Sequence, residues 1–152
     1  MTIAVEPVAI EWLAEELAYV GAKAASSAAR ETLDGLEREL HGGTISDDRA
    51  EVMGYLLGHG LVSGRIRAVY GAHAEMQATA LYAKTPQGKV LGKQFSDANS
   101  LFKALEGHTI RGIHVSARGP GLYSLTIETD EARVVTAFDG SGIDVRSVEV
   151  SY

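Results

Sequence analysis

Cysteine is absent from the 152-residue sequence, and its absence excludes several kinds of chemistry at once. A cysteine-free chain forms no disulfide, gives no thiolate ligand to zinc or to an iron–sulfur cluster, and has no thiol nucleophile. The five histidines show neither an H-x-x-x-H nor an H-E-x-x-H spacing, which are common histidine patterns of metal sites. We therefore expect no bound metal ion.

Long apolar runs are missing as well. No stretch approaches the run of about 18 apolar residues that a membrane-spanning helix needs. The first segment, MTIAVEPVAIEWLAEEL, carries acidic residues where a signal peptide carries basic ones. We expect a cytoplasmic protein that does not enter a membrane.

Three motifs of common catalytic sites are also absent, although 17 glycines gave each of them a chance to occur. They are the phosphate-binding G-x-x-x-x-G-K-[ST], the dinucleotide-binding G-x-G-x-x-G after a strand, and the serine-hydrolase G-x-S-x-G. Nucleotide-dependent and serine-hydrolase chemistry of the common kinds are therefore disfavoured. We predict no cofactor, and we favour a non-catalytic protein over an enzyme.

The residues that are present suit a globular protein. Apolar residues make up 45% and charged residues 22% of the chain, close to the average for globular domains, and the length suits a single domain over residues 1–152. Helical signals dominate residues 1–63 and strand signals residues 64–152. We predict an α+β fold with an N-terminal helical hairpin, followed by an antiparallel β-sheet of about five to six strands with one short inserted helix.

The helical signals are local and specific. Pro7 suits the first turn of a helix, and apolar residues then recur at steps of three and four until Gly42. The small-residue run at 22–29 leaves open one long helix or two helices joined near Ser26 and Ser27. Ser46 is a suitable N-cap for the next helix, because a serine oxygen accepts bonds from free N–H groups.

Turn signals divide the second part of the chain. Residues 78–84 and 88–95 flank Thr-Pro-Gln-Gly, which predicts a β-hairpin, and Ser96 and Asp97 open a short helix that ends at Gly107. Three or four strands follow, in the segments 109–117, 122–129, 132–138 and 143–152. Their alternating polar and apolar residues indicate a sheet with one wet face.

The stretch GAHAEMQA, residues 71–78, contains the H-x-E with which the zinc deaminase signature opens. In that family the histidine binds zinc, the glutamate moves protons, and a downstream P-C-x-x-C supplies two thiolates. His73, Glu75 and Pro120 resemble the pattern over about a third of the chain, but Gly121 and Ser124 stand where it needs cysteine. The resemblance implies at most a degenerate relative without the family's zinc site.

Both structural interpretations of residues 71–82 explain His73 and Glu75 without catalysis. In a strand the two side chains share the polar face, whereas in a helix His73 pairs with Gln77 at i, i+4. If the protein is an enzyme, the candidate catalytic residues are His73, Glu75 and His114, which would form an atypical metal-dependent or acid–base site.

Charge is unevenly distributed. Residues 1–51 hold eleven acidic and four basic residues, whereas residues 65–121 carry an excess of basic ones. Such an imbalance favours attraction between parts or copies of a protein. The candidate binding residues of the basic region are Arg65, Arg67, Lys84, Lys89, Lys93, Arg111 and Arg118.

These patterns favour a non-catalytic interaction or assembly subunit that binds a protein partner or forms a homo-oligomer. One alternative is a degenerate or atypical deaminase-like or metal-dependent enzyme that uses His73 and Glu75. A further alternative is a nucleic-acid-binding module that uses the basic region. Nucleic acid is not favoured, because few aromatic residues interleave with the basic ones.

Overall fold

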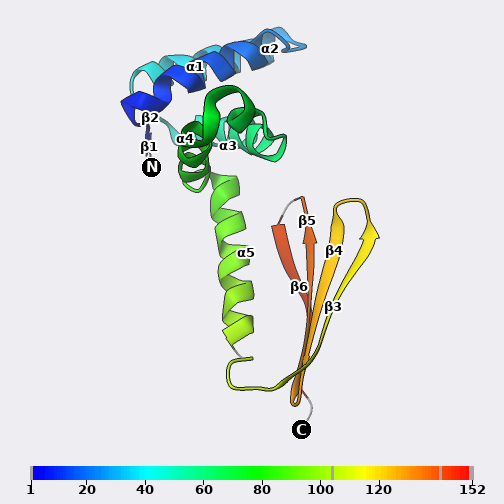
Figure 1. Cartoon of the computed structure of the whole chain (residues 1–152). Coiled ribbons are helices and arrows are strands. Elements are labelled where there is room, and N and C mark those ends of the chain that lie inside the picture. Colours follow the sequence, from blue (N-terminus) through cyan, green and yellow to red (C-terminus); the bar gives the residue numbers. More distant parts are fainter. Residues whose placement is uncertain (1, 104, 141, 151–152) are drawn as a thin grey trace. The chain divides into compact units, whose positions relative to one another are not determined.

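A computed structural model of the chain describes residues 2–103, 105–140 and 142–150 (Figure 1). The fold is α+β: the described residues form five helices, a four-stranded antiparallel sheet and a two-stranded sheet. The chain divides into two compact units, residues 1–89 and 90–152, and each unit is described by itself. Within the described ranges, no helix has both the length and the apolar character that a membrane span requires.

The first unit is helical. Its helices are α1 (Pro7–Gly21), α2 (Ser27–His41), α3 (Asp47–Val62) and α4 (Arg65–Tyr82), and the short strands β1 (Ile3–Ala4) and β2 (Thr44–Ile45) pair antiparallel. The expected helix start at Pro7 and the stop before Gly42 are confirmed. Of the two possibilities left open for residues 7–41, one long helix or two, the structure has two helices. The second begins after Ser26, because the Ser26 hydroxyl accepts a bond from the Ala29 N–H and caps α2.

The core of this unit comes from the apolar stripes of its helices. The fully buried side chains include Leu13 of α1, Leu36 and Leu40 of α2, Leu57 of α3 and Ile66 of α4. The hydrophobic effect holds the four helices together through this cluster, because each helix turns one apolar face inward.

Ser46 occupies the N-cap position of α3, as the sequence predicts, but its hydroxyl does not cap that helix. The Glu39 carboxylate instead accepts bonds from the Ser46 backbone N–H at 2.7 Å and from the Ser46 hydroxyl at 2.9 Å. Arg49 Nε lies 3.3 Å from the same carboxylate. Glu39 therefore ties the end of α2 to the start of α3 across the Gly42–Gly43 turn.

We expect Glu39→Gln to lower the free energy of unfolding by about 1 kcal/mol at neutral pH, because a charged acceptor is replaced by a neutral one. The bond from the Ser46 N–H holds the pKa of Glu39 below its ordinary value of 4.5, and the Ser46 hydroxyl and Arg49 act in the same direction. The contribution of the carboxylate is complete above pH 4.5 and is lost as the pH falls through the lowered pKa.

Urea unfolding of the two proteins from neutral to acid pH measures this effect. The difference in the free energy of unfolding between wild type and Glu39→Gln should become smaller below pH 4.5. Glu31→Gln, at an exposed position of the same helix, is the control and should change little. A difference that grows on acidification would contradict the assignment.

The sequence-based prediction of a β-hairpin over residues 78–95 was wrong. A helix, α4, occupies residues 65–82, and a second one, α5 (Pro86–Lys103), replaces both the predicted hairpin and the short helix that was to begin at Ser96. The reason is the chemistry of Thr85. Its hydroxyl donates to the Tyr82 carbonyl at 2.7 Å and accepts from the Gly88 N–H at 3.2 Å, so Thr85-Pro86 starts a helix rather than a hairpin turn.

The second unit contains the rest of α5 and the large sheet, which has four strands rather than the predicted five to six. These are β3 (Ile110–Gly119), β4 (Leu122–Thr129), β5 (Ala132–Asp139) and β6 (Gly142–Val150), in that spatial order (Figure 1). Three or four strands were predicted after residue 108, and the structure has four; residues 151–152 of the last predicted strand lie outside the described residues. Gly119-Pro120-Gly121 connects the first two strands. The register and the pleat give the sheet one polar and one apolar face.

Helix α5 covers only part of the apolar face. A β-carbon built on Gly142 would meet Leu91 and Gln94 of α5, so the helix lies against the start of β6. On the apolar face, Val134 and Thr136 of β5 and Ile143 of β6 are buried, whereas Ile113 and Val115 of β3 are exposed. Burial on this face is thus greatest at β5 and the start of β6, whereas Val148 near the end of β6 is 42% exposed.

Candidate functional site

His73 and Glu75 lie on α4, so the helical interpretation of residues 71–82 is the one observed. The exposed His73 Nε2 lies 3.3 Å from Gln77 Nε2, while Glu75 accepts a bond from Arg67 at 2.8 Å. Residues two apart on a helix project in different directions. The two side chains therefore have separate partners.

We expect His73→Ala to change the free energy of unfolding by about 0.5 kcal/mol or less, since an exposed helical side chain is replaced by a good helix former. Thermal unfolding of wild type and variant measures this difference. Gln77→Ala is the informative comparison, because Gln77 also accepts the Trp12 indole N–H at 2.9 Å. Gln77→Ala should lower the free energy of unfolding more than His73→Ala does. A larger decrease for His73→Ala would contradict the assignment of His73 to the surface.

His114, the third candidate catalytic residue, lies in the other unit, on β3. Its ring shares the polar face with Ser116, whose hydroxyl lies 2.7 Å from that of Ser124. Among the described residues, no group of three histidine, aspartate or glutamate side chains is arranged to hold a metal ion. The enzyme alternative stays a prediction.

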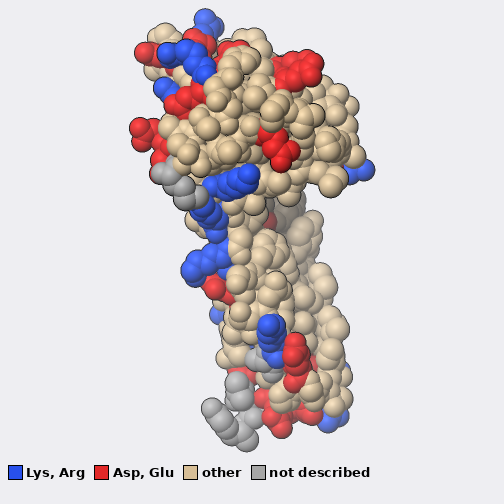
Figure 2. All heavy atoms as spheres, turned by 90° about the vertical axis from the view of Figure 1, so that its left-hand side faces the viewer, with Lys and Arg blue, Asp and Glu red and all other residues tan. Residues whose placement is uncertain are grey.

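The seven predicted basic binding residues are divided between the two units. Arg65, Arg67, Lys84 and Lys89 belong to the first unit, and Lys93, Arg111 and Arg118 to the second. Arg65 pairs with Glu16, Arg67 with Glu75, and Lys93 with Asp97. On the face shown in Figure 2, basic and acidic side chains lie interspersed. The nucleic-acid alternative stays a prediction.

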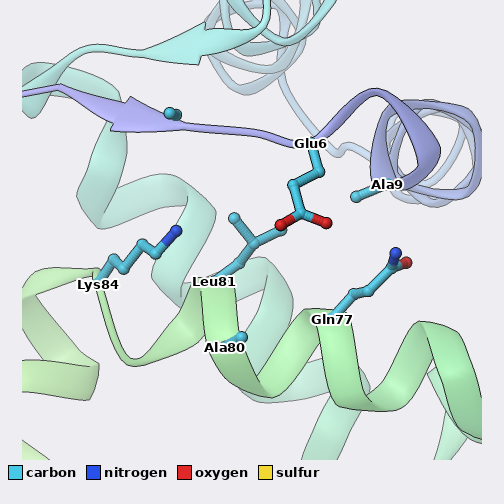
Figure 3. A pocket seen from close by; sticks show the side chains of 7 residues that line it. Glu6, Ala9, Gln77, Ala80, Leu81 and Lys84 are labelled. Atoms are coloured by element: carbon cyan, nitrogen blue, oxygen red, sulfur yellow. The ribbon is translucent and has the colours of Figure 1, made fainter.

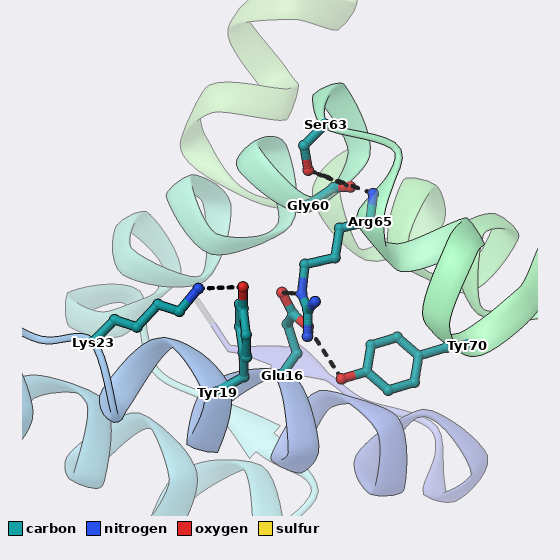
Figure 4. A network of polar contacts seen from close by, with 7 residues as sticks. All are labelled: Glu16, Tyr19, Lys23, Gly60, Ser63, Arg65 and Tyr70. Carbon is teal, nitrogen blue, oxygen red and sulfur yellow. Dashed lines mark hydrogen bonds and ion pairs between the residues drawn. The ribbon is translucent and has the colours of Figure 1, made fainter.

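The most polar buried group of the first unit is Glu16, which sequence analysis missed (Figure 4). Its side chain is 2% exposed, and its carboxylate accepts bonds from Arg65 Nε at 3.0 Å and from the Tyr70 hydroxyl at 3.1 Å. Burial raises the pKa of Tyr70, and its bond to Glu16 adds to the increase. The sequence feature that could have revealed this burial is the position of Glu16, three residues after Leu13 and next to Leu17, on the apolar face of α1.

The ring of Tyr19 lies next to the Glu16–Arg65 ion pair. The Arg65 guanidinium lies over the Tyr19 ring, 3.4 Å from its centroid, and Lys23 donates a hydrogen bond to the Tyr19 hydroxyl (Figure 4). That bond lowers the pKa of Tyr19. The bonds from Arg65 and Tyr70 therefore pair the Glu16 carboxylate within the unit, and the network joins α1 to the start of α4.

A small hollow lies between the start of α1 and the end of α4 (Figure 3). Glu6, just before α1, and Lys84, just after α4, reach toward it, and Gln77 of α4 borders it. Its floor is apolar, formed by Ala9, Ala80 and Leu81 among others. It offers one carboxylate and one ammonium at the protein surface.

Three exposed apolar side chains gather at the β3 edge of the large sheet. Ile113 and Val115 of β3 are 59% and 71% exposed, and Tyr123 of β4 is 49% exposed. The register places them on one face, because Ala117 pairs with Tyr123 and lies two residues after Val115. We call Ile113, Val115 and Tyr123 the β3 strip.

Comparison of the chain with protein-family models, with curated proteins and with solved structures found no match.

Proposed function

We propose that the protein is a non-catalytic interaction or assembly subunit, and that it binds protein through the β3 strip and the free edge beside it. The observation that carries the proposal is the exposure of Ile113, Val115 and Tyr123 on the apolar face of the sheet. An apolar surface of this kind, next to an edge strand, is typical of sheets that pair with another chain.

The mode of binding follows from the geometry of the strand. β3 is the outer strand of its sheet, so the backbone groups on its outer side have no partner strand within the sheet. A partner strand added there gains main-chain hydrogen bonds, and the exposed side chains supply apolar contacts and specificity.

The test compares three proteins: wild type, Val115→Lys in the β3 strip, and Val62→Lys at a position that is 82% exposed on α3. Each is examined for self-association by sedimentation velocity and for bound proteins by affinity capture from its source cells. We expect wild type and Val62→Lys to associate and Val115→Lys to fail. A wild-type protein that is a monomer at micromolar concentration and captures no protein would overturn the proposal.

A further inference from the structure

The two edges of the large sheet differ in how well they resist pairing. β3 carries Arg111 and Arg118 at its two register shifts, but between them it pairs regularly over residues 112–117, and this segment, Gly-Ile-His-Val-Ser-Ala, contains no lysine, arginine, aspartate or glutamate. The other edge, β6, carries Asp144, Arg146 and Glu149, and its register shifts next to Thr136. Charges and bulges protect edge strands from pairing. β3 is therefore the edge open to a partner strand.

We propose that this partner is β3 of a second copy of the chain, paired antiparallel about a two-fold axis at Val115. The inference rests on the proposed interaction function and names its partner. Two four-stranded sheets would then join into one continuous sheet of eight strands. An isologous contact of this type closes on itself and gives a dimer.

The alternation of β3 suits pairing with itself. Opposite residues of an antiparallel pair share one face of the sheet. With the axis at Val115, each Val115 faces its copy and Ile113 faces Ala117 of the second copy, so the apolar face continues across the junction. On the polar face, His114 faces Ser116. An axis at His114 would instead place two imidazoles opposite one another, which disfavours that register when they are protonated.

The charges near the edge suit the same register. A β-carbon on Gly112 would lie 3.6 Å from Glu128 Oε2, so this carboxylate oxygen lies beside the space left by the missing side chain. Glu128 Oε1 lies 3.2 Å from Arg133 Nε. Arg118 lies at the second register shift of β3, one residue beyond the regularly paired segment. With the axis at Val115, Arg118 of the second copy comes next to Gly112. It is then two strand spacings, about 10 Å, from Glu128.

Glycine at position 112 makes this ion pair feasible. The guanidinium of the second copy passes over a residue without a side chain and reaches the carboxylate on β4. The two-fold axis repeats the contact, so each interface gains two such pairs. Charge complementarity of this kind fixes register and partner choice more than it adds affinity.

The absence of cysteine allows the axis to be located directly. Val115→Cys introduces the only thiol of the chain, and two copies paired about residue 115 bring these thiols together within disulfide distance. We expect mild oxidation to convert most of the Val115→Cys protein into a covalent dimer. Val62→Cys, at an exposed valine of the helical unit, should remain largely monomeric. Efficient cross-linking of His114→Cys without that of Val115→Cys would overturn the register.

Sedimentation of the full chain over a range of concentrations measures the strength of pairing. We expect Val115→Lys to raise the dimer dissociation constant about tenfold or more, because two ammonium groups then meet at the axis. Val115 is 71% exposed in the single chain, so folding should be unaffected, and circular dichroism checks this. Arg118→Glu should weaken the dimer and Arg118→Lys should largely preserve it.

Three outcomes separate this inference from the function on which it rests. Concentration-dependent dimers lost in Val115→Lys support both. A monomeric wild type that captures a different protein, and loses it in Val115→Lys, overturns self-pairing and leaves the interaction function intact. A monomer that captures nothing overturns both.

Discussion

Replacing Glu16 with alanine is expected to lower the free energy of unfolding by about 3 kcal/mol, which corresponds to a fall in Tm of about 6 to 12 °C for a chain of this length. The carboxylate is 2% exposed and accepts bonds from Arg65 and Tyr70. Its removal leaves a guanidinium and a hydroxyl without their acceptor. Arg65 retains a side-chain exposure of 26%, so water offsets part of the loss and the expected value lies at the lower end for buried pairs.

Two further variants separate charge from hydrogen bonding in this network. Glu16→Gln keeps an acceptor of similar shape and should cost less than Glu16→Ala. Combining Glu16→Leu with Arg65→Met should recover part of the stability, because replacing both partners by apolar groups leaves no buried charge unpaired. Glu11→Gln, at an exposed position of the same helix, is the control. Urea unfolding measures each variant, and a change below about 1 kcal/mol for Glu16→Ala would contradict the role assigned to this network.

Gly88→Ala is expected to destabilise the first unit by about 3 kcal/mol or more. A β-carbon at Gly88 would lie 1.9 Å from the Tyr82 carbonyl oxygen and 2.8 Å from the Ala83 α-carbon. Both are backbone atoms at the end of α4, so the clash is relieved only by moving α4 or α5. The gain of about 1 kcal/mol that alanine normally brings to a helix does not offset this cost.

Gly92→Ala provides the matched control on the same helix. Among the described residues, no heavy atom outside the local helix backbone lies within 4 Å of a β-carbon placed at Gly92. Its substitution should therefore raise the free energy of unfolding by about 0.5 to 1 kcal/mol, through helix propensity alone. Thermal and urea unfolding of both variants measures the contrast. Similar effects of the two substitutions would contradict the close approach at Gly88.

Sequence patterns predicted the parts of this protein whose structure is decided locally. Pro7, Ser26 and Gly42 mark helix ends through backbone geometry and capping, and the structure follows them. The last four strands were also predictable, because their alternation and the turns between them act over a few residues. Thr-Pro-Gln-Gly was ambiguous at this level, since the same residues suit a hairpin turn and a helix start.

The contacts of the candidate site residues could not be predicted from short segments of the sequence. His73 and Glu75 were noticed because they resemble a motif, yet their partners in the structure are Gln77 and Arg67. Glu16 was passed over because its partners lie 49 and 54 residues further along the chain. The β3 strip was visible only as ordinary alternation, because exposure depends on where α5 covers the sheet.

The sequence by itself determined the α+β class, the helix start at Pro7 and the helix end before Gly42, the strands that follow residue 108, and the lack of thiol chemistry. Capping, turn propensity and residue alternation are properties of short segments, and this is why they can be predicted. Only the tertiary structure decided that Thr85 starts a helix, that Glu16 is buried against Arg65, and that Val115 lies exposed beside a free edge. Each of these depends on which distant segment packs against the residue, and local sequence does not specify that segment.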